Sequence, residues 1–201
     1  FPGFSNTGDC DVFVQKYDYD GNLIWTDQYG GTGDVGYTHD IFADEFGVYV
    51  CGSVSSSLSG EPYLGGGDAY VRMYDFDGNE LWTREFGTAS ADAALAVSQS
   101  KGFVQVCGQT RGALFEDTSA GGSDAFFTLY TLDGTHNQAF QTGTVHDEAA
   151  VDWQRVETGV SYITGWISGG AFDGQTAYGD YDIFIQQGVE PPVWLHQFGT
   201  S

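Results

Sequence analysis

Short apolar runs separated by turn residues recur along the whole chain, and the apolar positions within them alternate. Four such runs begin with aspartate and recur about every 57 residues, at positions 11–14, 68–71, 124–127 and 182–185. Alternation is typical of β-strands, and no stretch has the spacing of an amphipathic helix. The chain is therefore expected to consist of repeated β-strands.

Turn residues divide each repeat into strands. Asp-Gly follows the aspartate run at residues 20–21, 77–78 and 133–134, and this dipeptide between apolar runs predicts tight hairpins. The hairpins pair strand 12–19 with 23–29, and strand 69–76 with 80–86. Two further strand types are expected, the first at 37–43, 93–98 and 149–154, and the second at 48–54, 103–109 and 160–167.

The copies differ after the turn. A tryptophan recurs at Trp25, Trp82 and Trp194, whereas the third copy has Gln138. The fourth turn carries Pro-Pro at residues 191–192 in place of the Asp-Gly dipeptide. The fourth copy is also about two residues shorter than the others, so the repeat is not exact.

The aspartate-initiated strands are apolar on both faces, so each sheet is expected to lie between two neighbouring sheets. Small four-stranded sheets stacked face to face are the blades of a β-propeller. The predicted fold class is all-β, with tandem four-stranded antiparallel blades of β-propeller type.

One β-repeat domain is expected over residues 1–201, with repeat units at approximately 8–65, 66–121, 122–178 and 179–201.

The repeats resemble those of the SBBP-type β-propeller family. The second unit carries GGDAYV at 66–71, DGN at 77–79 and LW at 81–82, and further motifs are GGTGD at 30–34 and YITG at 162–165. The resemblance spans roughly residues 8–200. It implies propeller blades of the kind found in secreted and cell-surface proteins of varied roles, with no fixed catalytic set.

The resemblance also implies the phase of the blades. Residues 12–29 would form an N-terminal half blade, and the inner strand at 37–43 would begin the first of three full blades. Three and a half blades are too few to close a ring, because propellers typically have four to eight. Either the chain is part of a larger protein, or several chains combine.

The net charge of the chain bears on which classes of binding partner are expected. The chain has 28 acidic and 6 basic side chains, a net charge of −22 at pH 7. This charge repels nucleic-acid phosphates and anionic lipid surfaces, so no nucleic-acid partner is expected. No apolar run reaches the roughly 18 residues of a membrane helix, so no membrane insertion is expected.

Three cysteines cannot all pair within one chain. Cys51 and Cys107 occupy matching places in the repeat, where the next copy has Thr164. Both are expected to be buried packing thiols. A disulfide from Cys10 to one of them is the alternative.

Two of the turns present oxygen atoms at alternate positions, as the start of a calcium loop does. The residues are Asp18, Asp20, Asn22, Asp75, Asp77 and Asn79. Neither turn has the glutamate that completes an EF-hand loop, and Asp-Gly-Asn also forms a tight turn without an ion. The third copy replaces two of these positions with Thr131 and Thr135, so the turn interpretation is preferred. Calcium binding is the alternative, and no other cofactor is expected.

Asp34, Asp92 and Asp147 each follow a repeated glycine, and we expect them at one level of the repeat. They would form either an acidic rim that binds cations or caps that accept backbone hydrogen bonds. The capping interpretation is preferred.

The His-Asp dipeptides at 39–40 and 146–147 do not predict catalysis, because adjacent residues of a strand point to opposite faces. No nucleophile elbow or zinc-protease motif accompanies them. The protein is therefore expected not to be an enzyme. The alternative is an accessory part of a secreted hydrolase, with a carboxylate pair that sequence alone does not locate.

These features predict a non-enzymatic, extracellular or cell-surface protein with a structural or adhesive role. Copies would assemble through their open β edges by heterologous contacts, which build a fibre if they do not close. The serine-rich segment 53–60 is expected to be a plain flexible loop, and O-glycosylation is the alternative if the chain is secreted. The alternative is a glycan- or calcium-binding propeller module of a larger protein. Trp166 and Trp194 could stack on sugars, although burial of both is the simpler expectation.

Overall fold

The computed structural model describes residues 3–6, 8–32, 36–58, 60–156, 159–188 and 191–200. These residues form 14 β-strands in four antiparallel sheets, with no helix among them. Accordingly, the described part of the chain contains no helix long and apolar enough to cross a membrane. The all-β prediction is confirmed.

The strands of each sheet follow one another in chain order. The first sheet is a hairpin of Val12–Tyr17 (β1) and Leu23–Tyr29 (β2). The second sheet comprises Gly36–Ala43 (β3), Val48–Val54 (β4), Asp68–Tyr74 (β5) and Glu80–Phe86 (β6). The third comprises Asp92–Ser100 (β7), Phe103–Thr110 (β8), Asp124–Thr131 (β9) and His136–Thr142 (β10). The fourth comprises Asp147–Arg155 (β11), Ser161–Ser168 (β12), Tyr181–Gln187 (β13) and Trp194–Gly199 (β14).

The predicted hairpin pairing and the division into one two-stranded and three four-stranded sheets are confirmed. Two strands end earlier than predicted, at Tyr17 and Tyr74. The reason is that the next residue begins the turn. Asp18 Oδ1 accepts the backbone N–H groups of Asp20 and Asn22 at 2.9 and 2.8 Å, which draws the chain out of the strand.

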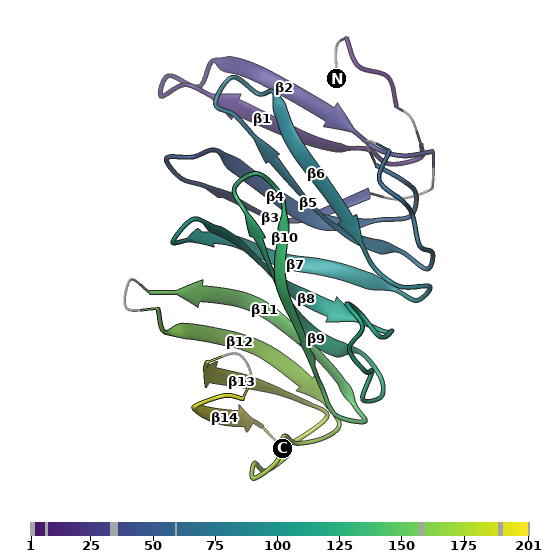
Figure 1. Ribbon diagram of the computed structural model, residues 1–201, viewed down its shortest axis with the longest axis vertical. Helices are drawn as coiled ribbons and strands as arrows, with labels where there is room; N and C mark the ends of the chain where they lie inside the picture. The colour runs from purple at the N-terminus through teal and green to yellow at the C-terminus, as the bar shows by residue number, and fades with distance from the viewer. Residues whose placement is uncertain are drawn as a thin grey trace.

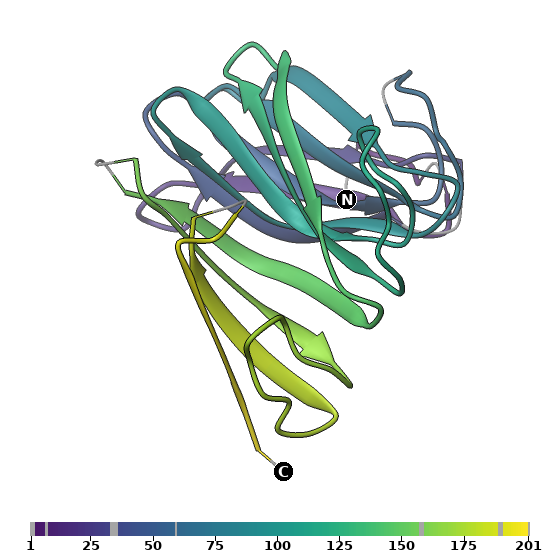
Figure 2. The same ribbon diagram turned by 60° about the horizontal axis from the view of Figure 1, so that its bottom comes forward.

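The four sheets follow one another along the long axis of the molecule, from the N-terminal hairpin to the C-terminal sheet (Figure 1). Strand β7 packs against β3, β4 and β5, and β11 packs against β7, β8 and β9. Hydrogen bonds also join the first strands of neighbouring sheets. Val97 N in β7 donates to Asp40 in β3 at 2.9 Å, and Ser98 Oγ in β7 donates to the Trp153 carbonyl in β11 at 2.9 Å. Figure 2 shows the fourth sheet turned away from the other three.

Apolar clusters fill the spaces between successive sheets. Every residue of β5 is buried, and in β9 only the last residue is not. These two strands lie in sheets with neighbours on both sides, as their apolar faces predict. In contrast, β1 and β13 alternate between buried and exposed residues. The first and last sheets therefore bury one face and expose the other.

The cysteines are free thiols. Cys51 and Cys107 are buried, and burial raises the pKa of both thiols well above the ordinary value. Cys10 is exposed. The prediction of two buried packing thiols is confirmed, and the alternative disulfide to Cys10 is not formed.

Candidate functional site

Two of the contacts between neighbouring sheets each contain a tryptophan of one sheet whose ring packs on a turn of the following sheet. Trp25 in β2 donates its Nε1–H to the Phe76 carbonyl at 3.1 Å. Trp82 in β6 donates in the same way to the Leu132 carbonyl at 2.9 Å. Each acceptor immediately precedes the Asp-Gly dipeptide of its turn. One geometry therefore joins the first sheet to the second and the second to the third.

The turn glycine makes this close approach possible. Gly78 and Gly134 have φ values of 86° and 79°, in the left-handed region that favours glycine. A Cβ at these positions would lie 2.7 Å from the Trp25 ring and 2.8 Å from the Trp82 ring. The Asp-Gly dipeptide thus forms both the hairpin turn and the surface that receives the preceding sheet.

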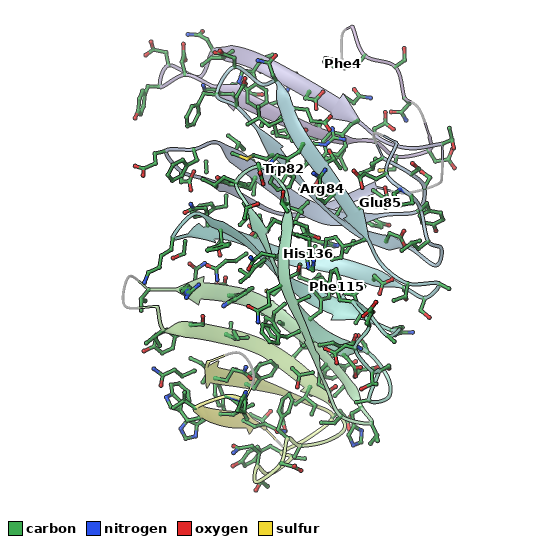
Figure 3. All side chains as sticks on the ribbon, viewed as in Figure 1. Phe4, Trp82, Arg84, Glu85, Phe115 and His136 are labelled. Carbon is green, nitrogen blue, oxygen red and sulfur yellow. The ribbon has the colours of Figure 1, made fainter. Side chains whose placement is uncertain are left out.

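Basic side chains on the same face strengthen these contacts. Arg84, two residues after Trp82, donates its Nε–H to the Gly134 carbonyl at 2.8 Å. Lys16 Nζ donates to the Phe76 carbonyl at 2.7 Å. Figure 3 shows Trp82 and Arg84 close together on β6. In both contacts, a tryptophan and a cation therefore donate to carbonyls of the receiving turn: Trp25 and Lys16 share the Phe76 carbonyl, and Trp82 and Arg84 use those of Leu132 and Gly134.

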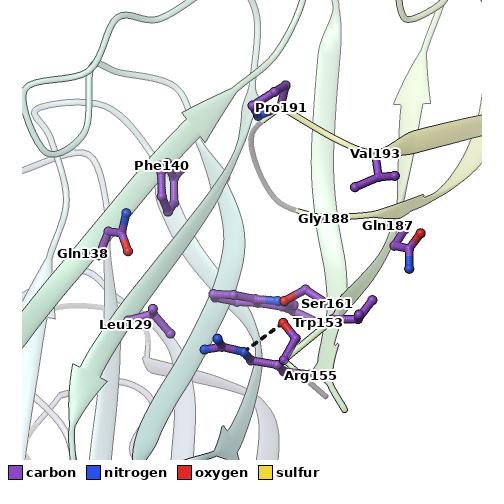
Figure 4. Close-up of a pocket in the computed structure, with 12 residues that line it drawn as sticks. Leu129, Gln138, Phe140, Trp153, Arg155, Ser161, Gln187, Gly188, Pro191 and Val193 are labelled. Atoms are coloured by element: carbon purple, nitrogen blue, oxygen red, sulfur yellow. Dashed lines mark hydrogen bonds between the residues drawn. The ribbon is translucent and has the colours of Figure 1, made fainter. Parts of the chain in front are cut away.

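The contact between the third and fourth sheets lacks this arrangement. Gln138 pairs with Leu129 in the register that Trp82 has with Met73, and the receiving turn carries Pro191. A pocket of about 470 Å³ opens here. Figure 4 shows its lining, which includes Leu129, Gln138, Phe140, Trp153, Arg155 and Pro191. The loss of the tryptophan and the loss of the Asp-Gly turn thus coincide at one place.

The first sheet exposes the face that a preceding sheet would cover. Phe13 and Tyr17 occupy the places of Tyr70 and Tyr74 in β5, which are fully buried, but each is 53% exposed. The turn at residues 18–22 has the same backbone hydrogen bonds as the turn at 75–79. Among the described residues, however, no atom beyond the chain neighbours lies within 4 Å of a Cβ built at Gly21.

The last sheet exposes the opposite face. Ile183 and Ile185 occupy the places of Ala69 and Val71, which are fully buried, but they are 51% and 37% exposed. Trp194 pairs with Gln187 in the register that Trp82 has with Met73. The two ends of the molecule thus present the two halves of the contact that joins sheets within it.

Trp166 and Trp194, the candidates for stacking on sugars, are both half-buried. Trp166 lies edge-on to Tyr181, with ring centroids 5.9 Å apart. Trp194 lies 5.4 Å from the His196 ring. Both belong to the fourth sheet, on its exposed side.

The six predicted calcium ligands lie in the turns at 18–22 and 75–79. Asp75 Oδ1 accepts the N–H groups of Asp77 and Asn79, both at 2.9 Å, and Oδ2 accepts the Asn79 amide at 2.8 Å. The Asn79 amide lowers the pKa of the Asp75 carboxyl, and the equivalent bond from Asn22 lowers that of Asp18. These are the bonds of a capped turn. The described residues contain no group of three or more histidine, cysteine or carboxylate side chains arranged to hold a metal.

In three of the four sheets, the aspartate of the repeat accepts a hydrogen bond from a glutamine of the next strand. The amide-to-carboxylate pairs are Gln28–Asp11 at 2.9 Å, Gln141–Asp124 at 2.8 Å and Gln197–Asp182 at 2.7 Å. In the second sheet the position equivalent to the glutamine holds Glu85, whose charge interacts with that of Asp68. Glu85 accepts the Leu58 N–H at 2.7 Å, but its buried Oε1 has no hydrogen-bond partner among the described residues. Burial raises the pKa of Glu85 to about 7.

Asp92 and Asp147 accept backbone hydrogen bonds, as the capping interpretation predicts. Thr88 N donates to Asp92 at 2.7 Å, and Ser123 N donates to Asp147 at 2.7 Å. Asp34 lies outside the described residues.

The prediction that these aspartates share one level of the repeat is wrong for Asp147. The strand pairing is irregular directly after Ala94 in β7 and directly after Ala150 in β11, so these two alanines are equivalent. Asp92 and Glu148 each lie two residues before them and are therefore equivalent too. Glu148 accepts the N–H of a residue four positions earlier at 2.9 Å, as Asp92 does. Sequence comparison missed Glu148 because it matched residue type rather than strand register.

Among the described residues, no hydrogen bond joins His39 to Asp40 or His146 to Asp147. Asp40 instead accepts from Val97 N in the next sheet. Burial lowers the pKa of His39.

No family model matches the chain. The chain is similar to the regulatory protein FlaEY of Caulobacter vibrioides, with 28% identity over 220 residues. The match covers 96% of this chain but 21% of that protein. The chain therefore spans about a fifth of the length of the curated relative it matches.

Proposed function

We propose that this protein is a non-enzymatic structural β-repeat whose sheets are blades of β-propeller type and whose copies assemble through their end faces. The observation that carries the proposal is the pair of exposed faces on the first and last sheets. Phe13 and Tyr17 at one end, and Ile183 and Ile185 at the other, hold positions that are buried wherever two sheets meet within the chain. Apolar patches of this kind mark interaction surfaces.

The packing of the interior sheets supports this role. Each interior contact buries apolar side chains from both sheets, and burial stabilises by roughly 25 cal/mol per Å² of apolar surface. The end faces offer the same kind of surface to a further sheet. Contact between the two different ends is heterologous, so it builds rings if the rotation closes and filaments if it does not.

The proposed location and the similarity to a regulatory protein are both compatible with a protein that acts by binding others. The resemblance to SBBP-type repeats implies a secreted or cell-surface location, and we propose that location here. A regulatory protein that acts by binding others needs no catalytic group, so the printed name of the Caulobacter relative is compatible with this role. A net charge of −22 keeps single copies soluble and opposes their association at low salt.

Sedimentation velocity and negative-stain electron microscopy over a concentration series test the proposal. Ile183→Glu places a charge in the exposed face of the last sheet and is expected to abolish assembly. Ile41→Glu is the matched control, because Ile41 is 56% exposed but lies on β3 of the second sheet. Equal assembly of both variants and the wild type would overturn the end-face proposal.

The pocket at Gln138 favours glycan binding as a second function. It combines the Trp153 and Phe140 rings with the polar groups of Gln138 and Arg155, a mixture that suits a sugar. Trp153 Nε1 is buried and has no hydrogen-bond partner among the described residues. A glycan panel probed with the wild type and with Gln138→Trp tests this function. Binding that Gln138→Trp abolishes supports it, and no binding to any glycan contradicts it.

A further inference from the structure

We propose that Trp194 of one copy packs on the 18–22 turn of a second copy, in the arrangement that joins successive sheets within the chain. This inference rests on the proposed self-assembly and names the residues that set its register and direction. The partner is a second copy because the two elements lie at opposite ends of the molecule, as the positions of β14 and of the β1–β2 hairpin in Figure 1 show.

Trp194, which would donate the hydrogen bond in the proposed contact, is placed in its strand as the two internal tryptophans are. Trp25, Trp82 and Trp194 occupy one register position, opposite Lys16, Met73 and Gln187 respectively. The first two tryptophans each reach a turn of the next sheet and donate an indole hydrogen bond there. Trp194 lies in the last sheet of the described structure, where no following sheet is present to receive it.

The 18–22 turn, which would receive Trp194 of another copy, has the same geometry as the 75–79 turn that receives Trp25. In the turn at 18–22, Asp18 N donates to the Asn22 carbonyl at 3.0 Å and Gly21 N donates to the Asp18 carbonyl at 3.1 Å. The equivalent bonds at 75–79 measure 3.0 and 3.2 Å. The φ of Gly21 is 82°, close to the 86° of Gly78. The two turns therefore have the same shape, although only the second has an indole ring on its glycine.

The carbonyl acceptors correspond as well. Tyr19 immediately precedes the Asp-Gly dipeptide, as Phe76 and Leu132 do in the turns that receive Trp25 and Trp82. Tyr19 is fully exposed, so its surroundings are open to a partner. We expect Trp194 Nε1–H to donate to the Tyr19 carbonyl of the second copy.

A second polar contact fits the same docking. Arg84 lies two residues after Trp82 and donates to the carbonyl of Gly134. His196 lies two residues after Trp194, on the same face of its strand. Its ring can donate an N–H to the Gly21 carbonyl of the second copy, so the docked pair would repeat both polar bonds of the internal contact.

Complementation between two blocked variants tests the inference. Trp194→Ala removes the docking ring and leaves the turn intact. Gly21→Asn keeps the turn, because asparagine tolerates positive φ, but places a side chain where the indole would lie. Each variant alone is expected to be monomeric. An equimolar mixture should give heterodimers and nothing longer, because one intact contact remains per pair.

Matched controls separate docking from folding. Gly60→Asn changes a glycine with the same φ of 82° and open surroundings, away from the ends of the sheet stack. Phe46→Ala removes an exposed ring from the turn between β3 and β4. Both controls should assemble as the wild type does. Circular dichroism should show that all four variants are folded.

The outcomes distinguish this inference from the proposed function. Weakening of self-association by roughly tenfold or more in both blocked variants, with rescue on mixing, supports the inference. If Trp194→Ala and Gly21→Asn assemble as the wild type does while Ile183→Glu does not assemble, the inference about Trp194 is wrong and the end-face proposal stands. A wild type that stays monomeric at every concentration would overturn both.

Discussion

Glu85 lies beside Asp68 in the place from which Gln141 donates its amide to Asp124 in the next sheet. An amide always has a hydrogen to donate, whereas a carboxyl group has one only when it is protonated. Burial, and to a smaller extent the charge of Asp68, raise the pKa of Glu85 to about 7. The second sheet therefore has a titratable carboxyl group where the other sheets have an amide.

The stability of the protein should depend on pH through this group. Glu85 ionises near 4.5 when the chain is unfolded and near 7 in the folded protein, so the folded state binds more protons between these values. The contribution of Glu85 to the free energy of unfolding is fully present below about pH 4.5 and is lost as the pH rises to about 7. Glu85→Gln should therefore add roughly 1–3 kcal/mol at pH 8 and almost nothing at pH 4.5.

Urea denaturation of the wild type and of Glu85→Gln at the two pH values measures this difference. Glu45→Gln changes an exposed glutamate in the turn between β3 and β4 and should have no effect at either pH. An equal effect of Glu85→Gln at both pH values would show that no proton is held at this position.

The packing of Trp25 on Gly78 predicts a large difference between two glycine substitutions. Gly78→Ala introduces a Cβ at positive φ and 2.7 Å from the indole, so it should lower the free energy of unfolding by roughly 2–4 kcal/mol. Gly21→Ala introduces the same backbone strain without an indole and should cost about 1 kcal/mol. Thermal or chemical denaturation of dilute protein compares them. Equal losses would mean that the indole contact adds nothing.

Arg72 fixes the first sheet to the second. Its guanidinium is buried 3.7 Å from the centre of the Tyr29 ring, and Nη1 lies 3.5 Å from Asp27 and 3.4 Å from Glu80. Arg72→Met would remove the cation that two partly exposed carboxylates share, together with its contact with the Tyr29 ring, and should cost roughly 1–2 kcal/mol. Hydrogen exchange of the first sheet should accelerate most. Arg111→Met, which changes an exposed arginine, is the control, and an unchanged exchange pattern in Arg72→Met would contradict the role of Arg72.

Much of the fold followed from the sequence because its determinants are local. Asp-Gly turns fixed the hairpins, and the spacing of the aspartate runs fixed which strands share a sheet. The tryptophan-to-glycine contact could not be predicted, because it joins Trp82 to Gly134 across a sheet boundary. Glu148, by contrast, lies 56 residues after Asp92, the spacing of Asp68 and Asp124, and was missed because the neighbouring Asp147 matched the expected residue type.

The turns at 18–22 and 75–79 allow a test of the calcium alternative. Asp18 and Asp75 already accept hydrogen bonds from the backbone and from an asparagine amide, so the turns should hold their shape without an ion. Millimolar Ca²⁺ is expected to raise the melting temperature no more than Mg²⁺ at equal ionic strength. A shift specific to Ca²⁺ that disappears in Asp75→Asn would instead establish a calcium site.

We propose that the exposed faces of the first and last sheets join copies of this chain, and sedimentation velocity of the wild type over a wide concentration range measures that association. The sedimentation coefficient should rise with concentration, and rise further with moderate salt because salt screens the repulsion between copies of charge −22. A single species of 21.7 kDa at every concentration and salt level would show that these faces do not join copies.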